Sequence, residues 1–229
     1  YFYMVLPIMA ALTMITGVLG AAAQNEFRRI LSFHIISQVG YMVLGLALQT
    51  RLALAGTVFY LVHHIIVKAN LFLVSGVVER LKGTFELAHL GGIYRSNGWI
   101  AFLFFIPAFS LAGFPPLSGF WAKMILIRAS LDIHAYWLAF VAAVVGLMTV
   151  YSMTKIWAEV FWKPAPQTHQ DAQPATARNI SAWMFAPIAA LALLTIIIGL
   201  GAEVVFRFAF QAAEELSHPE YYVHAVLGK

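Results

Sequence analysis

The sequence has 229 residues, of which 62% are hydrophobic and only 10% are charged, whereas an average soluble domain has about 25% charged residues. This composition excludes a soluble globular protein and a disordered chain. The net charge of +4 comes from basic residues scattered singly between apolar segments, which excludes nucleic-acid binding, and the lack of cysteine excludes disulfides and cysteine-ligated iron–sulfur clusters.

Apolar segments account for most of the chain. A helix needs about 20 apolar residues to cross the ~30 Å hydrocarbon core of a bilayer. Six segments meet this length: about 3–23, 31–49, 54–78, 98–128, 136–161 and 182–206. We therefore predict an all-α polytopic membrane protein of about six transmembrane helices. Because the sequence opens at Tyr1 inside a hydrophobic run, without Met, we expect it to be a fragment.

Basic residues in the connecting loops predict the orientation of these spans, because successive loops lie on alternate sides of the membrane. One side carries seven basic residues: Arg28, Arg29, Arg80, Lys82, Arg95, Lys163 and Arg178. The other side carries four: Arg51, Arg128, Arg207 and Lys229. The positive-inside rule then places the first group in the cytoplasm and both termini outside.

The second segment carries polar residues at a helical spacing. His34, Ser37, Gln38 and Tyr41 follow one another at i, i+3, i+4 and i+7, which places them on one stripe of a helix. In lipid such a stripe must face protein or water. Hydrogen bonding between packed helices explains Ser37 and Gln38 as well as function does. His34 can also titrate, so we favour a functional role for it.

The third segment contains a lysine near its middle. A lysine at that depth costs about 2.5–3.5 kcal/mol even on the lenient insertion scale. Tyr60, His64 and Lys68 recur every four residues, and Ser75 returns to the same face. His64 and Lys68 lie one turn apart, so they can exchange a proton through one water. The alternative is a structural Lys68 paired with a carboxylate, but the acidic residues lie near span ends or in loops.

The remaining polar residues of the third segment lie on a different edge of that helix. His63 and Asn70 form this second edge. The adjacent His63 and His64 point about 100° apart, so they do not form a metal-binding pair.

The fourth segment cannot form one straight helix. It contains Pro107, Gly113, Pro115, Pro116 and Gly119, and each proline removes a backbone donor and clashes with the preceding turn. Irregular backbone at membrane depth is tolerated only inside protein or beside a water-filled cavity. We therefore predict a discontinuous helix, a common element of ion sites in transporters.

Lys123 follows this break, in the second half of the fourth segment. It stands five residues before Arg128, so its position fits a side chain that reaches the membrane interface as well as a functional site.

In the fifth segment, Lys155 and Glu159 are spaced i, i+4 near the predicted cytoplasmic end, which predicts an interfacial ion pair. The loop histidines lack the spacing of metal ligands, and the sequence contains no nucleotide-binding loop or nucleophile elbow. We therefore predict no metal, no cofactor and no enzymatic chemistry.

Four motifs, in their order along the chain, are similar to those of a known family. RRILSFHIISQVGYMVLGLAL, FYLVHHIIVKANLFLVSGVVER, LGGIYRS and SLAGFPPLSGFWAK closely resemble the D subunit of Mrp-type (Mnh, Pha) multisubunit cation/proton antiporters. More distantly, they resemble the antiporter-like subunits of respiratory complex I and membrane-bound hydrogenases. The resemblance covers about residues 1–162.

Members of this family have about fourteen helices, with two inverted five-helix repeats that each hold a broken helix and a lysine-centred half-channel. The resemblance implies that residues 1–162 are the second repeat, 163–181 a polar loop, and 182–229 the final transmembrane helix and tail. The glutamate and lysine of the first repeat are absent from this sequence.

The resemblance also implies a role for individual residues. Lys68 in HHIIVKANLF corresponds to the central channel lysine, His64 to its hydration or relay partner, and Lys123 in SGFWAK to the residue through which protons leave. We add His63 and His34 to this set of proton-relay candidates, although the family varies at the position of His34.

The implied function is proton translocation within a multisubunit Na⁺ or K⁺/proton antiporter of a bacterial inner membrane. This is a secondary transporter, whose partners would be the other subunits, the lipid bilayer, H⁺, and Na⁺ or K⁺. One alternative is a redox-driven proton-pumping module of a complex I or hydrogenase assembly, and another is an assembly scaffold. The wording FHIISQVGYM and HHIIVKANLF favours the Mrp type. The spans show no carboxylate cage for a dehydrated cation, so the cation path is left open.

Overall fold

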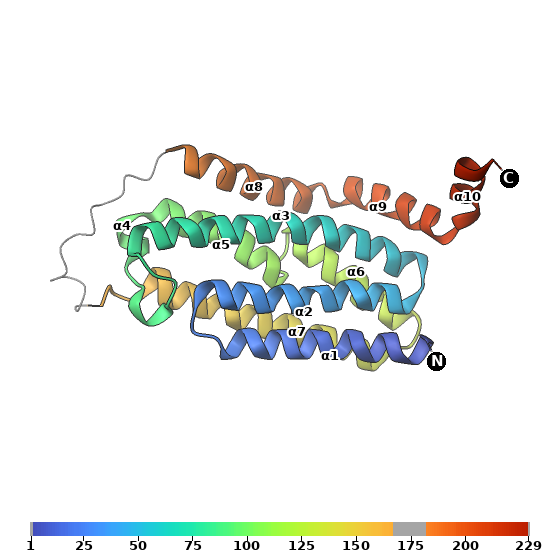
Figure 1. The fold of residues 1–229 in the computed structure, drawn as a ribbon, viewed down its shortest axis with the longest axis horizontal. Helices are drawn as coiled ribbons and strands as arrows, with labels where there is room; N and C mark the ends of the chain where they lie inside the picture. Colours follow the sequence, from blue (N-terminus) through green and yellow to red (C-terminus); the bar gives the residue numbers. More distant parts are fainter. Residues whose placement is uncertain (1, 167–181, 229) are drawn as a thin grey trace.

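Long helices lie side by side along the longest axis of the protein, as Figure 1 shows for the computed structural model. The structure describes residues 2–166 and 182–228, and in these ranges it contains helices but no strand. The longer helices are α1 (Phe2–Ala23), α2 (Phe27–Leu48), α3 (Arg51–Lys82), α5 (Gly98–Ala112), α6 (Ser118–Asp132), α7 (Tyr136–Ile156), α8 (Ala182–Leu200) and α9 (Ala202–Ser217). The shorter ones are η1 (Leu87–His89), α4 (Ile93–Ser96), the π-helical η2 (Trp157–Trp162) and α10 (Pro219–Leu227).

The membrane-spanning helices confirm the predicted all-α polytopic fold. In the described parts of the chain, five helices are long and apolar enough to cross a membrane, and Gly98–Ala112 is a shorter apolar helix. The predicted span 182–206 runs across the junction between α8 and α9 at Gly201. Most of the predicted polar loop at 163–181 lies outside the described residues, which include only 163–166 of it.

The predicted discontinuous helix is present as α5 and α6, with residues 113–117 between them. Gly113 ends α5 in the left-handed conformation (φ 96°), which a residue with a side chain rarely adopts. The start of α6 then passes close to α5, because a Cβ atom at Gly119 would lie 1.8 Å from the carbonyl oxygen of Ser110. The two half-helices therefore pack at a distance that only glycine permits.

The connection between α5 and α6 is covered by the far end of the chain. Gly199 of α8 lies against it so closely that a Cβ atom there would be 2.5 Å from the carbonyl oxygen of Pro116. The indole Nε1–H of Trp121 donates a 3.0 Å hydrogen bond to the carbonyl oxygen of Gly199. In Figure 1, α8 and α9 follow one another along the outer side of α3.

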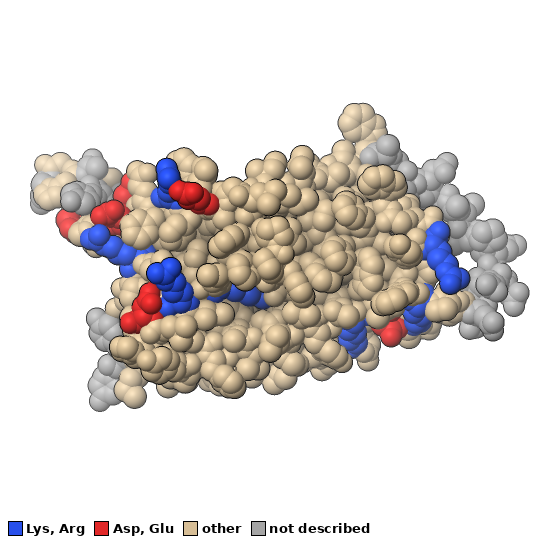
Figure 2. Space-filling view, turned by 180° about the vertical axis from the view of Figure 1, so that it is seen from behind, with Lys and Arg blue, Asp and Glu red and all other residues tan. Residues whose placement is uncertain are grey.

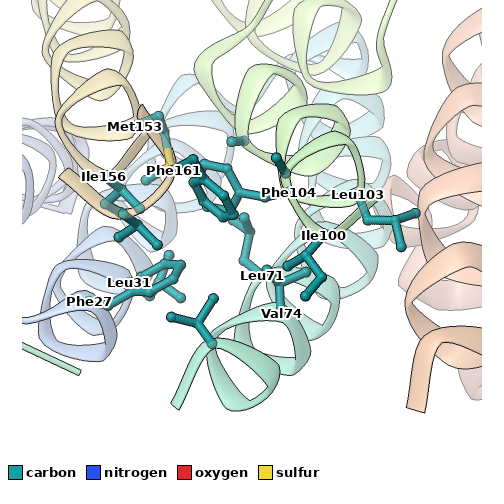
Figure 3. Packing of buried hydrophobic residues seen from close by; sticks show 14 of the residues in the cluster. Phe27, Leu31, Leu71, Val74, Ile100, Leu103, Phe104, Met153, Ile156 and Phe161 are labelled. Atoms are coloured by element: carbon teal, nitrogen blue, oxygen red, sulfur yellow. The ribbon is translucent and has the colours of Figure 1, made fainter. Parts of the chain in front are cut away.

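Buried apolar side chains form two clusters, one toward each end of the helices. Figure 3 shows part of the first cluster, which includes Phe27, Leu31, Leu71, Val74, Ile100, Leu103, Phe104, Met153, Ile156 and Phe161. The second cluster includes Met14, Tyr41, Leu44, Phe59, Tyr60, Leu126, Leu138 and Val145. Together they join α2, α3, the broken helix and α7 into one body.

Charged side chains gather mainly toward the two ends of the molecule, as Figure 2 shows for one face. At one end, the predicted ion pair between Lys155 and Glu159 is wrong. The Lys155 ammonium donates to the carbonyl oxygens of Ala22 and Gln24, at 3.1 and 2.8 Å, while Glu159 pairs with Lys163 at 2.8 Å. The carbonyls at the end of α1 lack helical partners and attract a cation, and the π-helix that begins at Trp157 changes the spacing.

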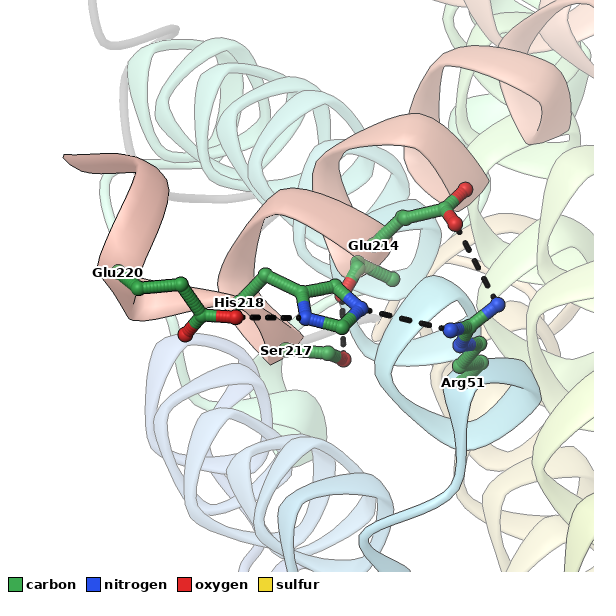
Figure 4. Close-up of polar contacts among 6 residues, drawn as sticks. Arg51, Glu214, Ser217, His218 and Glu220 are labelled. Atoms are coloured by element: carbon green, nitrogen blue, oxygen red, sulfur yellow. Dashed lines mark hydrogen bonds and ion pairs between the residues drawn. The ribbon is translucent and has the colours of Figure 1, made fainter. Parts of the chain in front are cut away.

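At the other end, α1 begins and α10 ends (Figure 1). There the tail is fastened to the start of α3, as Figure 4 shows. The Arg51 guanidinium lies 3.3 Å from a carboxylate oxygen of Glu214 and 3.4 Å from Nε2 of His218, and His218 Nδ1 lies 3.0 Å from Glu220.

Candidate functional site

A layer of buried polar side chains lies at the border between the two apolar clusters. On α2, the first cluster ends at Leu31 and the second begins at Tyr41, and on α3 the two clusters meet between Tyr60 and Val67. We call this border the polar layer, and its members are His34, Ser37, Gln38, His63, His64, Lys68, Asn70, Ser110 and Ser118, all of them buried. Polar groups are therefore concentrated at the middle of the helices, where lipid would surround the protein.

Lys68 lies inside this layer with 5% of its surface exposed. Its ammonium donates a 2.9 Å hydrogen bond to the carbonyl oxygen of Leu31 on α2. Among the described residues, no carboxylate lies within ion-pair distance of Lys68, so the alternative of a lysine paired with an acidic residue of this chain is not found there. The carbonyl of Leu31 is its one hydrogen-bond partner among the described residues.

His34 and His64 both lie one helical turn from the contact between Lys68 and Leu31, on the side of the second apolar cluster. His34 follows Leu31 by one turn of α2, and His64 precedes Lys68 by one turn of α3. Both ring nitrogens of His34 and Nε2 of His64 are buried without a hydrogen-bond partner in the described protein. An unsatisfied buried polar atom costs about 1–3 kcal/mol, so these rings form a site that water would occupy favourably.

A pair of tyrosines connects the polar layer to Lys123. The Tyr60 hydroxyl donates to the side-chain oxygen of Gln38, and its ring stacks on Tyr41 with the centroids 5.3 Å apart. The Tyr41 hydroxyl donates to the carbonyl oxygen of Ala142 on α7. The Lys123 ammonium lies 5.4 Å from the centre of the Tyr41 ring, within the range of a cation–π contact.

Lys123 does not extend to the membrane interface, because only 6% of its surface is exposed. Its ammonium donates to the carbonyl oxygens of Leu111 and Ala112, at 2.8 and 3.3 Å. These are carbonyls that the break leaves without helical partners at the end of α5. A groove of about 430 Å³ between the broken helix and α7 has Lys123 in its lining, together with Gly113 and Gly146.

His63 points to the break and thus lies on the separate edge that the helical phase predicts. Its Nδ1 is 2.8 Å from the Ser118 hydroxyl, which is 3.1 Å from the Ser110 hydroxyl. The Ser110 oxygen accepts from the backbone N–H of Gly119, at 3.2 Å. The Nε2 atom of His63 is buried and unpartnered in the described protein. His63 therefore links α3 to the first turn of α6.

Ser37 and Ser75 serve as contacts between helices, whereas the amide atoms of Asn70 are buried without a hydrogen-bond partner in the described protein. Ser37 donates to the carbonyl oxygen of Met14 on α1, and Ser75 accepts a 3.3 Å hydrogen bond from Nε of Arg28. Arg28 and Ser110 were not predicted from the sequence. In the sequence, Arg28 resembles any basic residue of a loop, and Ser110 is an isolated polar residue in an apolar segment. Their partners become apparent only when the helices are packed together.

Three comparisons with known proteins agree with this architecture. The family described as NADH:quinone oxidoreductase/Mrp antiporter, TM, matches residues 1–149. The D subunit of the Na(+)/H(+) antiporter of Alkalihalophilus pseudofirmus is 47% identical over 220 residues, which are 96% of this chain and 44% of that protein. A chain in the structure of the Mrp complex from Dietzia sp. DQ12-45-1b is 35% identical, with a TM-score of 0.87, over 99% of this chain and 49% of that chain.

A more distant likeness concerns the fold alone. A chain of respiratory complex I from Thermus thermophilus with bound NADH has a TM-score of 0.82 at 22% identity, over 94% of this chain and 44% of that chain. In each case this chain spans less than half the length of the protein that it matches.

Proposed function

Because this chain belongs to the NADH:quinone oxidoreductase/Mrp antiporter transmembrane family, we propose that it is the C-terminal antiporter-like half of a cation/proton antiporter subunit. It conducts protons through its membrane-embedded lysines and histidines while a multisubunit complex exchanges them for Na⁺ or K⁺. The complex lies in a bacterial plasma membrane. The protein is a transporter component and catalyses no covalent reaction.

The observation that carries this proposal is the pair of buried lysines, each bound to backbone carbonyls. A permanent ion pair would fix the proton on such a lysine, whereas a carbonyl oxygen also tolerates the neutral amine. Lys68 and Lys123 are thus placed to gain and lose a proton without leaving an unpaired carboxylate behind.

The route runs through the polar layer. His64 and His34 pass protons to and from Lys68 through water that their unpartnered nitrogens bind. Gln38 and the Tyr60 hydroxyl continue this route toward the second apolar cluster. Lys123 then delivers the proton to the groove beside α7, on the side of the polar layer predicted to face outside.

The stacked rings of Tyr41 and Tyr60 form the dry part of the route. Both are fully buried, and each hydroxyl already has a partner, so little space remains between them for water. We propose that protons cross this point only when the hydrogen bond between Tyr60 and Gln38 rearranges. His63 also contributes to this transfer, because its contact with Ser118 positions the start of α6, the helix that carries Lys123.

The relatives support an antiporter subunit over the two alternatives, a redox-driven proton-pumping module and an assembly scaffold. The relative from Alkalihalophilus pseudofirmus, at 47% identity, is named as part of a Na(+)/H(+) antiporter, whereas the likeness to complex I at 22% identity carries the fold alone. The Mrp complex supports an assembly with further subunits as the setting of this chain. The two buried lysines argue against a scaffold, which has no use for charges at membrane depth.

The test replaces each lysine in the complete complex. Lys68→Ala and Lys123→Ala are expected to abolish cation-driven ΔpH changes in inverted membrane vesicles while the complex still assembles. Lys163→Ala is the matched control, because Lys163 forms a partly exposed ion pair at the end of the molecule. It is expected to keep wild-type exchange. Wild-type exchange by correctly assembled Lys68→Ala and Lys123→Ala complexes would leave only the scaffold role.

A further inference from the structure

A second groove, of about 380 Å³, lies outside the proton route. Its floor is α3, through Leu52 and Phe59, and one wall is α6 from Trp121 to Arg128. The other wall is the junction of α8 and α9, from Gly199 to Phe206. The hydrogen bond from Trp121 to Gly199 joins the two walls, and the chain bends at Gly201, next to this contact. The groove therefore lies where the chain changes from α8 to α9.

The two ends of this groove differ in polarity. Trp121, Gly199 and Phe59 line it near the level of the break, and they offer an apolar surface. Arg128 lies near the end of α6, ten residues beyond the start of the helix at Ser118, which is about 15 Å along its axis. The break is near the middle of the helices, so Arg128 reaches the level of the lipid headgroups. The groove is therefore apolar inside and cationic at its mouth.

Arg128 is an exposed cation that forms no hydrogen bond or ion pair with any residue that the structure describes. The one carboxylate that lines the groove, Glu203, is already paired with Arg207 at 2.6 Å. The start of α3 at Arg51 borders the same mouth through Leu52 and adds the positive end of a helix dipole. Glu203 therefore does not neutralise Arg128, and Arg128 is a cation without a counterion among the described residues.

The dimensions of the groove select the kind of molecule that fits. One turn of an α-helix, about 10 Å across and 5.4 Å long, fills roughly 400 Å³. A groove of about 380 Å³ is smaller than one whole turn, so a partner helix would enter it only with its side chains. An acyl chain is narrower and follows the groove along its length, and the planar guanidinium of arginine binds phosphate oxygens in pairs.

We propose that this groove binds an anionic glycerophospholipid, with one acyl chain between α6 and the α8–α9 junction and its phosphate on Arg128. The bound lipid fills the space between α6 and the α8–α9 junction. It stabilises the packing of these helices against α3. This site is independent of the proton route, because none of the relay residues lines it.

The test measures lipid that remains on the purified complex. Complexes are delipidated, incubated with phosphatidylglycerol or phosphatidylcholine, and examined by native mass spectrometry. Arg128→Gln is expected to lower the retention of phosphatidylglycerol about tenfold, because a charge-assisted hydrogen bond is lost. Arg95→Gln removes the same charge from exposed α4 and is expected to change nothing. Ala202→Phe fills the groove and is expected to reduce retention of both lipids.

Each other outcome contradicts the proposal. Equal losses for Arg128→Gln and Arg95→Gln would show a general effect of charge and no site. Equal binding of phosphatidylglycerol and phosphatidylcholine by the wild type would show that the groove holds boundary lipid without selecting an anionic headgroup. Cross-linking of an Ala202→Cys variant to another protein of the assembled complex would show that this other protein occupies the groove. Because the relay lysines stay intact in these variants, failure here does not bear on the proposed transport.

Discussion

At the scale of single residues, the two buried lysines share one way of being stabilised. Lys68 binds a carbonyl within an intact helix, whereas Lys123 binds two carbonyls that the break leaves free. The second arrangement supplies the stronger local dipole, since the last carbonyls of a helix carry partial negative charge. Lys123 is therefore the better site for a resting ammonium, and Lys68 depends more on its polar neighbours.

His64 is the closest of those neighbours along α3. We predict that His64→Gln in the complete complex lowers the rate of exchange but does not abolish it, because His34 remains as the second histidine of the proposed route. The pH optimum should also shift, since glutamine cannot bind a proton. Exchange measured across a pH series checks this, and a profile identical to the wild type would assign His64 to packing.

Tyr60 provides a test of the dry segment. Tyr60→Phe removes the donor to Gln38, leaving the buried amide oxygen without a partner, so we expect a loss of about 1–3 kcal/mol in stability and slower exchange. Tyr151→Phe is the control, because Tyr151 is exposed on α7. Thermal unfolding and vesicle exchange report the two effects. Exchange at the wild-type rate in a destabilised Tyr60→Phe complex would remove this hydroxyl from the route.

At the scale of elements, the broken helix depends on one close contact. Gly119→Ala would place a methyl group against the carbonyl oxygen of Ser110, so we expect α6 to be displaced at a cost of about 1–3 kcal/mol or more. Gly98→Ala is the matched control, because a Cβ atom at this first residue of α5 meets nothing within 4 Å.

The measurement compares the yield of assembled complex and the exchange rate of the two glycine variants. We expect Gly98→Ala to match the wild type and Gly119→Ala to lose both assembly and exchange. Normal assembly with Gly119→Ala would mean that the two half-helices tolerate a wider separation.

The elements also show how far the sequence alone can lead. Length and hydropathy predict the spans, and the prolines with Gly113 predict the break, because these features depend on neighbours within a few residues. The helical phase separates the face of Lys68 from the edge of His63. It cannot show that His63 meets Ser118, 55 residues away, since that contact depends on how α3 and α6 cross.

The same limit explains the error at Lys155. An i, i+4 spacing predicts the ion pair with Glu159 only for a regular α-helix, whereas here the helix changes to π-type at Trp157. The competing partners of Lys155, the free carbonyls of α1, lie more than 130 residues earlier in the chain. Local sequence contains no sign of them.

At the scale of the whole molecule, the tail is fastened at one end by charged residues. Hydrogen bonds from its own backbone and from His218 hold the pKa of Glu220 below its usual value. A carboxyl of this kind stabilises the docked tail at pH values above its usual range, near 4.3, and that contribution disappears as the pH falls through the lower value.

We therefore predict that acidification to below about pH 4 modestly increases hydrogen exchange in residues 214–228, while exchange at pH 7 stays slow. Glu220→Gln should show the faster exchange already at pH 7 and little further change. If the wild type and Glu220→Gln respond to pH in the same way, Glu220 does not contribute to the docking of the tail.

The contact between Gly199 and the α5–α6 connection has a consequence for biosynthesis. The ribosome completes the α5–α6 connection about 80 residues before it reaches Gly199, and chains enter the membrane from their N-terminal side first. During that interval the irregular backbone around Pro116 has no cover from α8. A chain truncated anywhere between the two segments would leave this irregular backbone permanently without its cover.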